Sequence, residues 1–399
     1  MNTPINHYLI FDPVAFLGGS KIASKEALLL TNPNHSKYTI LTAHKESWSN
    51  DDFCKQHQVN VITVPSIAGL SKVDNGLGYW LKQCIYTLFI LAVWLRSEKI
   101  TALIGNSGPG VDMSLYIVKK LINIPIIQLI HGPIEKSRSV GYCLTIADRV
   151  YYLSSAKNSV YKALNHYLRT KLSGVDAYAL SNYLLLSENY QSFQNGISNM
   201  HWPSRVQYDF PTIFWCASLL KWKGLDMLTE SARKLDKQSP FAANICFIRP
   251  IDTSLPTCNA PTLLPHVQWY QEPKNLDEIR SRSNIFVSTS RNEPFGLSIL
   301  EAMAAGMCII IPEDNAYWDQ VLTHNVNCIK YEPNCVSSLT EAISRATHDV
   351  DLIKTLGSEA FNVAKQYQAE NCYRSLVNGL NHPDFINEEP SLIPTKAIR

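Results

Sequence analysis

Short apolar runs alternate with longer segments of helical periodicity along the first half of the chain. The runs are rich in β-branched and aromatic residues, which favours strands, and the longer segments carry apolar positions three and four residues apart, which favours helices. Strands joined by helical crossovers form a parallel, doubly wound sheet. Residues 166–190 fit this alternation less well and are interpreted as an insertion. The pattern predicts strands over 8–11, 37–41, 59–64, 102–104, 124–130 and 149–153, and helices over 77–97 and 113–121.

The same alternation restarts after the aperiodic stretch 199–204. A chain of 399 residues exceeds what one hydrophobic core usually supports, so two domains are expected. The predicted fold class is α/β, with two Rossmann-like doubly wound domains that face a central, ligand-binding cleft. We expect an N-terminal domain over 1–203, a C-terminal domain over 204–368, and a C-terminal helix and loose tail over 369–399, with the helix packing back on the N-terminal domain. The predicted strands of the second half are 213–217, 244–248, 267–270, 284–288 and 308–311, with helices over 225–235, 276–281 and 297–305.

The two halves of the chain differ in charge. Residues 1–200 carry 18 Lys and Arg against 12 Asp and Glu, a balance of +6, whereas residues 201–399 carry 18 against 22, a balance of −4. A basic first half suits an anionic membrane surface or an anionic acceptor. Because the chain contains no dense run of Arg and Lys, nucleic acid is not expected as a partner.

Cysteine usage and the N-terminus indicate a cytoplasmic protein. The ten Cys are scattered singly without a CxxC or a zinc-finger spacing, which is typical of a reducing compartment. The first residues lack the basic and apolar regions of a signal peptide.

The longest apolar run, Cys84–Leu95, is too short to cross a bilayer core. One interpretation is a helix buried against a sheet. The alternative is a helix that lies in a membrane interface, with polar and aromatic anchors at its ends: Trp80, Lys82, Trp94, Arg96 and Lys99.

The segment 288–306 contains the main candidate for chemistry. A strand there ends in polar residues, and a helix is expected to begin at or just after Pro294, which suits a first helical turn. Free amides at a helix N-terminus, together with the helix dipole, bind anions such as a diphosphate. The amides expected to do so are those of Phe295, Gly296 and Leu297.

Two carboxylates flank this helix start. Glu293 lies just before it, where it can accept hydrogen bonds from sugar hydroxyls, and Glu301 lies about two turns further on, within reach of a diol such as that of ribose. For two Glu at this spacing alone, a capping acid and an ordinary surface residue would be the simpler interpretation.

The surrounding residues resemble a known family. Glu293-x7-Glu301 followed by Ala-Met-Ala-Ala-Gly306 is similar to the signature of family 4 retaining glycosyltransferases with the GT-B fold. Further motifs follow in that family's order over nearly the whole chain. They are the glycine loop Gly18-Gly19, which approaches the donor diphosphate in the family, His131-Gly132-Pro133 beside the reacting sugar, the turn Asn195-Gly196-Ile197, and the phosphate-binding turn Lys221-Trp222-Lys223-Gly224.

The resemblance implies a function. We expect transfer of a hexosyl or N-acetylhexosaminyl group, with retention of configuration, from a nucleotide-diphosphate sugar to a hydroxyl of a glycan or lipid-linked glycan. Such a reaction belongs to bacterial surface polysaccharide or lipopolysaccharide assembly, at the inner face of the cell membrane. It implies His131, Glu293 and Lys223 as catalytic residues, a donor sugar as co-substrate, and neither a metal nor another cofactor.

One position departs from the family pattern. Where the family has Gly-Arg-Leu, with an Arg that pairs with the diphosphate, this chain has Ala217-Ser218-Leu219. Ser218 is therefore expected in the donor site without a guanidinium. Arg249, at the end of the next predicted strand, is our candidate to replace it; the alternative is an Arg that merely caps a strand end in solvent.

Other functions are also considered. Gly105–Gly110 does not fit the dinucleotide fingerprint, which argues against an NAD-dependent oxidoreductase, and it is expected to line the acceptor side of the cleft. Asp349-Val350-Asp351 resembles a metal-binding Asp-x-Asp but is interpreted as a solvated helix start. A degenerate protein that binds a sugar nucleotide or a partner without transfer remains an alternative.

Overall fold

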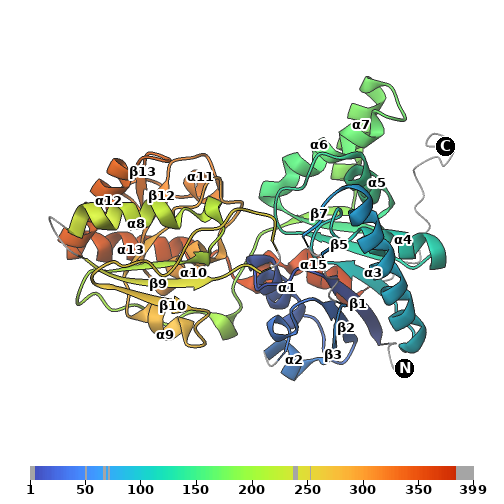
Figure 1. Ribbon diagram of the computed structural model, residues 1–399, viewed down its shortest axis with the longest axis horizontal. Helices are drawn as coiled ribbons and strands as arrows, with labels where there is room; N and C mark the ends of the chain where they lie inside the picture. Colours follow the sequence, from blue (N-terminus) through green and yellow to red (C-terminus); the bar gives the residue numbers. More distant parts are fainter. Residues whose placement is uncertain are drawn as a thin grey trace. The chain divides into compact units, whose positions relative to one another are not determined.

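The computed structural model describes residues 5–49, 52–65, 69–70, 72–236, 241–251 and 253–382. The chain divides into two compact units, each with its own sheet and helices (Figure 1). Unit 1 is Met1–Asn195 with Glu370–Arg399, and unit 2 is Gly196–Ala369. This division lies after residue 195, eight residues before the boundary predicted after residue 203. Most of the tail predicted from Asn381 lies outside the described residues.

The sheet of unit 1 is parallel throughout, with the strand order β3-β2-β1-β4-β5-β6-β7. The order reverses between β1 and β4, so the carboxyl ends of these two strands form the topological switch point, where open α/β sheets bind ligands. The strands are β1 (Asn6–Asp12), β2 (Ser36–Thr42), β3 (Gln58–Thr63), β4 (Ala102–Gly105), β5 (Ile126–Ile130), β6 (Arg149–Leu153) and β7 (Tyr190–Phe193).

The segment predicted as an insertion is an ordinary crossover, so that interpretation was wrong. Residues 166–190 contain the end of one helix, all of the next, and the first residue of β7, which pairs with β6. The weak pattern has a physical cause, because α7 exposes several apolar side chains and β7 contains only two apolar residues. The helices of unit 1 are α1 (Gly19–Leu29), α2 (Asp52–Gln56), α3 (Gly76–Arg96), α4 (Met113–Ile122), α5 (Arg138–Ile146), α6 (Lys157–Leu168), α7 (Gly174–Leu186) and α15 (Arg374–Asn381).

The C-terminal helix α15 returns to unit 1, where it lies against α1 and β7 (Figure 1). The Tyr8 hydroxyl on β1 donates to the carbonyl of Leu380 at 2.5 Å. Tyr373, immediately before α15, is fully buried, and its ring lies 5.9 Å from that of Phe193. Helix α15 and the residue before it therefore complete the core of the first unit.

Unit 2 contains a second parallel sheet, with the strand order β10-β9-β8-β11-β12-β13. Two parallel-sheet, Rossmann-like units confirm the predicted fold class. Asp349 caps α13 by accepting from the Leu352 amide at 2.8 Å, which confirms its interpretation as a helix start. The elements are β8 (Thr212–Ser218), α8 (Leu225–Asp236), β9 (Ala242–Ile248), β10 (Val267–Gln271), α9 (Leu276–Ser281), β11 (Ile285–Val287), α10 (Leu297–Ala305), β12 (Cys308–Pro312), α11 (Tyr317–Val321), β13 (Ile329–Tyr331), α12 (Val336–His348) and α13 (Val350–Ala364).

Helix α3 is apolar on both of its faces. By length and composition it is the one described helix that could cross a membrane, and 28% of its most apolar window is buried. Tyr86, Ile90 and Val93 pack into the core, as the buried-helix interpretation requires. The opposite face, however, carries a stripe of large exposed side chains. This α3 stripe consists of Leu77, Trp80, Leu81, Leu88 and Leu95.

Candidate active site

The Lys-Gly turn of unit 2 is held against the loop that follows β11. The Thr289 hydroxyl donates to the carbonyl of Lys223 at 2.7 Å, and the Arg291 amide donates to that of Trp222 at 2.9 Å. Gly224 ends the turn with φ 71°, and a Cβ there would lie 2.2 Å from the Thr289 carbonyl oxygen. Only glycine permits both this conformation and this approach.

The two loops bring Lys223 and Glu293 together. The Lys223 ammonium lies 2.5 Å from a Glu293 carboxylate oxygen, and both side chains are largely buried. The same ammonium lies 4.0 Å from the centre of the Trp222 ring, a cation–π contact. Two predicted catalytic residues, 70 positions apart in the sequence, therefore form one ion pair.

The site helix has the predicted bounds 297–305, so it begins three residues after Pro294 rather than at that proline. Helix α10 begins at Leu297, so Pro294 and Phe295 precede it, and Gly296 occupies the N-cap in the left-handed region with φ 75°. A residue in this conformation cannot belong to a right-handed helix, which explains why the helix begins only after Gly296. Within the described residues, no hydrogen bond is made by the amides of Leu297 and Ser298. These two amides are donors of the first turn of α10, whereas the amide of Phe295 precedes the helix.

Phe295 has a structural role. Its side chain is 2% exposed and packs among three aromatic rings of the same unit. The ring centroids lie 4.8 Å away for Tyr317, 5.1 Å for Trp318 and 6.0 Å for Tyr367. This packing anchors the backbone between Glu293 and the start of α10.

Glu301 also has a cationic partner. One of its carboxylate oxygens accepts from the Arg280 guanidinium at 2.6 Å, and Arg280, which is nearly buried, also pairs with Asp277 at 3.0 Å. A carboxylate has several lone pairs, so it can accept from more than one donor at a time. Arg280 fixes the position of that carboxylate.

Ser218 and Arg249 lie at adjacent strand ends. Ser218 ends β8 and is in register with Ile248, the last residue of β9, so Arg249 follows immediately beside it. The Arg249 guanidinium is exposed and donates to the carbonyl of Ala260 at 2.7 Å. The register therefore places the backbone of Arg249 beside Ser218, while its guanidinium is bound to the loop at Ala260.

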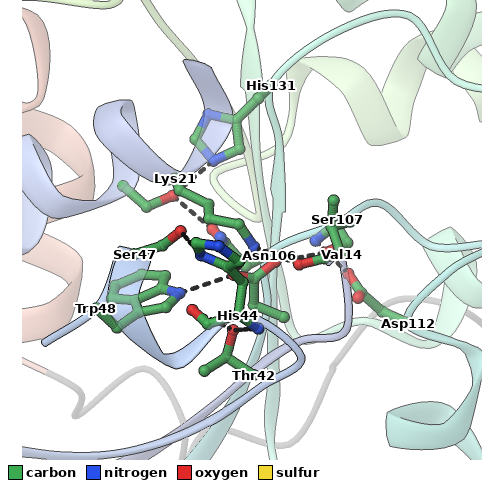
Figure 2. Close-up of polar contacts among 12 residues, drawn as sticks. Val14, Lys21, Thr42, His44, Ser47, Trp48, Asn106, Ser107, Asp112 and His131 are labelled. Atoms are coloured by element: carbon green, nitrogen blue, oxygen red, sulfur yellow. Dashed lines mark hydrogen bonds and ion pairs between the residues drawn. The ribbon is translucent and has the colours of Figure 1, made fainter. Parts of the chain in front are cut away.

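A buried polar network occupies the switch point of unit 1 (Figure 2). Asp12 ends β1, and its carboxylate receives the Lys21 ammonium, the Trp48 indole at 2.7 Å and the Ser107 hydroxyl at 3.1 Å. Asp12 and Lys21 are each 1% exposed. Lys21 also donates to the carbonyl of Val14 at 2.8 Å, so it fixes the loop between β1 and α1.

That loop contains the predicted glycines. Gly18 is the N-cap of α1 in extended backbone, and Gly19 is its first residue. Sequence analysis missed the residues that hold this loop, namely Asp12, Lys21 and Trp48. The available signal was Asp12 at the end of an apolar strand, a position where parallel sheets carry site residues.

His131 follows β5 and joins a second part of the network. Its Nε2 lies 2.9 Å from the Ser24 hydroxyl, which donates to Asn106 Oδ1 at 2.5 Å. Its ring contacts Phe193 edge-on, with centroids 5.6 Å apart. Burial lowers the pKa of His131 to about 4, so the imidazole is neutral at physiological pH.

All ten cysteines are free thiols. Among the described residues, no group of three or more His, Cys, Asp and Glu side chains is arranged to hold a metal ion.

The second unit matches a known protein family. Residues 197–363 match the model of the family described as glycosyl transferases group 1. An uncharacterized glycosyltransferase of Methanocaldococcus jannaschii is 22% identical over 263 residues, which cover 64% of this chain and 68% of that protein.

Solved structures share the fold over almost the whole chain. A glycosyltransferase from Rickettsia africae superposes with a TM-score of 0.65 at 15% identity, covering 97% of this chain and 100% of that one. HepE of Anabaena in complex with UDP superposes with a TM-score of 0.62 at 13% identity, covering 94% and 99%. These likenesses show that the two units have the GT-B fold. Together with the family match, they support a glycosyltransferase, and the matched residues lie wholly within unit 2.

The lowered pKa of His131 predicts a pH dependence of stability. Because the pKa is about 4 in the folded protein and near 6.5 when the chain unfolds, the unfolded state binds the proton first. The stabilisation is therefore complete above pH 6.5 and is lost as the pH falls toward 4. Urea denaturation at pH 7 and pH 5 should show that His131→Gln loses less stability than the wild type, by about 2 kcal/mol. An equal loss in both proteins would contradict this assignment.

Proposed function

We propose that the protein is a retaining glycosyltransferase of family 4 that takes its sugar from a nucleotide-diphosphate donor. The observation that carries the proposal is the Lys223–Glu293 ion pair beside the free amides of α10. A cation, a carboxylate and two unpaired amides lie at the carboxyl edge of a parallel sheet, where such folds bind nucleotides. HepE was solved with UDP, which supports a nucleoside diphosphate as the donor of this chain also.

The diphosphate interacts with the positive end of this site. An ammonium has three N–H donors, so Lys223 can keep Glu293 and still donate to a phosphate oxygen. The Leu297 and Ser298 amides add neutral donors, and the helix dipole adds positive potential. Arg249 is proposed to supply the guanidinium that the family pattern has at the position of Ser218. Preorganised donors of this kind stabilise the charge that develops on the leaving diphosphate.

The sugar and the ribose are assigned to the two carboxylates. Glu293 accepts hydrogen bonds from hydroxyls of the transferred sugar, and Glu301, held by Arg280, accepts from the ribose diol. His131 contacts the sugar as a neutral ring, as the resemblance implies. The leaving-group oxygen can take the proton of the incoming hydroxyl, so the reaction requires neither a side-chain base nor a metal ion.

The acceptor proposal rests on unit 1. The α3 stripe extends from Leu77 to Leu95, about 27 Å of helix. Arg96 and Lys99 are exposed at its C-terminal end, where they can contact anionic headgroups. An exposed apolar stripe with cations at its end is suited to a membrane interface. We therefore propose a lipid-linked glycan at the inner face of the cell membrane as the acceptor, in surface polysaccharide or lipopolysaccharide assembly.

Replacement of the site lysine tests the donor assignment. Lys223→Met removes a charge-assisted hydrogen bond to phosphate, which should weaken nucleoside diphosphate binding roughly ten- to a hundredfold. Calorimetric titration with a panel of nucleoside diphosphates measures the affinity, and NMR of the product gives its anomeric configuration. The exposed Lys234→Met, whose lysine pairs with Glu230, is the matched control.

Three outcomes of that experiment are informative. Equal affinity in Lys223→Met and wild type would contradict the diphosphate site, and an inverted product would contradict retention. Binding of the nucleotide sugar with no transfer to any acceptor would favour the degenerate alternative.

The role of Arg249 has its own test. If its guanidinium contacts the diphosphate, Arg249→Ala should raise the donor KM roughly tenfold, because one charge-assisted hydrogen bond is lost. Arg282→Ala is the control, since Arg282 is exposed and pairs with Glu278 near the amino ends of the same strands. Unchanged donor affinity and turnover in Arg249→Ala would rule out this role.

The α3 stripe predicts binding to lipid. Leu81→Glu with Leu88→Glu should reduce cosedimentation with vesicles that contain anionic lipid, and raised salt should weaken binding of the wild type. Both side chains are exposed, so folding should be unaffected. Leu263→Glu, at a fully exposed position in unit 2, is the control. If neither the double substitution nor raised salt changes vesicle binding, the membrane assignment is refuted.

A further inference from the structure

Three side chains at the switch point of unit 1 form a chain of hydrogen bonds (Figure 2). Asn106 follows β4, His131 follows β5, and Ser24 lies on α1. The Ser24 hydroxyl donates to Asn106 Oδ1 at 2.5 Å and lies 2.9 Å from His131 Nε2. We call these three residues the relay.

The direction of these bonds fixes the tautomer of His131. A serine hydroxyl has one hydrogen, and Ser24 gives it to Asn106. Ser24 must therefore accept from His131, so Nε2 carries the imidazole hydrogen. Because burial keeps the ring neutral, Nδ1 holds a lone pair and no proton.

Each end of the relay is a buried polar atom. Within the described residues, Asn106 Nδ2 and His131 Nδ1 are buried atoms without a hydrogen bond. Asn106 is only 2% exposed, so ordinary solvation does not satisfy its amide hydrogens. Buried polar groups of this kind are usually completed by a ligand or an ordered water. One end of the relay offers donors and the other an acceptor.

We propose that Ser24 and Asn106 are positioning residues that hold His131 as its Nε2–H tautomer, so that Asn106 Nδ2 and His131 Nδ1 recognise sugar hydroxyls. A hydroxyl both accepts and donates, so it suits both ends of the relay. A carboxylate accepts only, so the carboxylate of a hexuronic acid could satisfy Asn106 Nδ2 but would be repelled by the lone pair of His131 Nδ1. The relay therefore selects an uncharged sugar at this point. This inference rests on the proposed function, and the hydroxyl belongs to the donor sugar or to the acceptor.

The tautomer can be measured without any turnover. NMR of the full chain with ¹⁵N-labelled histidine should show a proton on Nε2 of His131 and none on Nδ1. Ser24→Ala removes the acceptor of that proton and should increase the Nδ1–H population, whereas Ser24→Thr should restore the wild-type form. Thr39→Val is the matched control, because Thr39 Oγ1 lies 2.9 Å from Nε2 of another buried histidine, His7. This control should leave the His131 signals unchanged.

Kinetics separate the two roles of Asn106. Asn106→Asp keeps an acceptor for Ser24, so the Nε2–H tautomer should persist. Because the substitution removes the amide donors, the KM for either the donor or the acceptor should rise roughly three- to tenfold. Asn106→Leu removes both roles and should also change the tautomer. If the hydroxyl belongs to the donor sugar, the KM for donor hydrolysis without acceptor rises; if it belongs to the acceptor, only the acceptor KM rises at saturating donor.

Failure of the relay and failure of the proposed function are distinguishable. An Nδ1–H tautomer in the wild type, or a tautomer that Ser24→Ala leaves unchanged, would overturn the relay even in an active transferase. If Asn106→Asp changes neither the donor KM nor the acceptor KM, the proposed hydroxyl contact is overturned. An Nε2–H tautomer that depends on Ser24, in a protein that transfers no sugar, would support the relay and contradict the proposed function.

Discussion

The close approach of two loops in unit 2 is the constraint on which the candidate donor site depends. Gly224 lies so near the Thr289 carbonyl that any Cβ would collide, and hydrogen bonds from Thr289 and Arg291 then hold the turn in place. Only in this arrangement can Lys223 reach Glu293. The aromatic packing of Phe295 fixes the other side of the loop, so the ion pair lies on a rigid support next to the free amides of α10.

Each unit carries a Lys–carboxylate pair near the end of a central strand, but the two pairs differ in exposure. Asp12 and Lys21 are fully buried, and the carboxylate has three donors, so this pair is internally satisfied and fixes a loop. Breaking such a pair typically costs about 3–5 kcal/mol, because a charge is left buried without a partner. Lys223 and Glu293 keep some exposure, and each retains unused hydrogen-bonding capacity. The first pair is suited to a structural role and the second to a ligand.

Much of the fold follows from local patterns, since a strand that is buried on both faces is an apolar run whatever surrounds it. The core strands of both sheets were predicted within a few residues, whereas β7 and β13 escaped notice because each contains few apolar residues. Lys223 and Glu293 were both predicted as site residues through the family resemblance. Their contact was not, because 70 residues separate them and only the packed sheet brings them together. Helix α10 has the predicted bounds 297–305, and it begins after Pro294 because a left-handed Gly296 overrides the preference of proline for a first turn.

Helix α3 shows why hydropathy alone leaves the membrane question open. Its residues are apolar all round, and a sequence pattern of this kind is typical both of a buried helix and of one that lies in lipid. The structure separates the two faces, since Tyr86, Ile90 and Val93 pack into the core while Leu77, Leu88 and Leu95 remain exposed. Core packing explains the apolar character of the first set. It leaves the second set without a folding role, and an exposed apolar stripe of this length usually marks a binding surface.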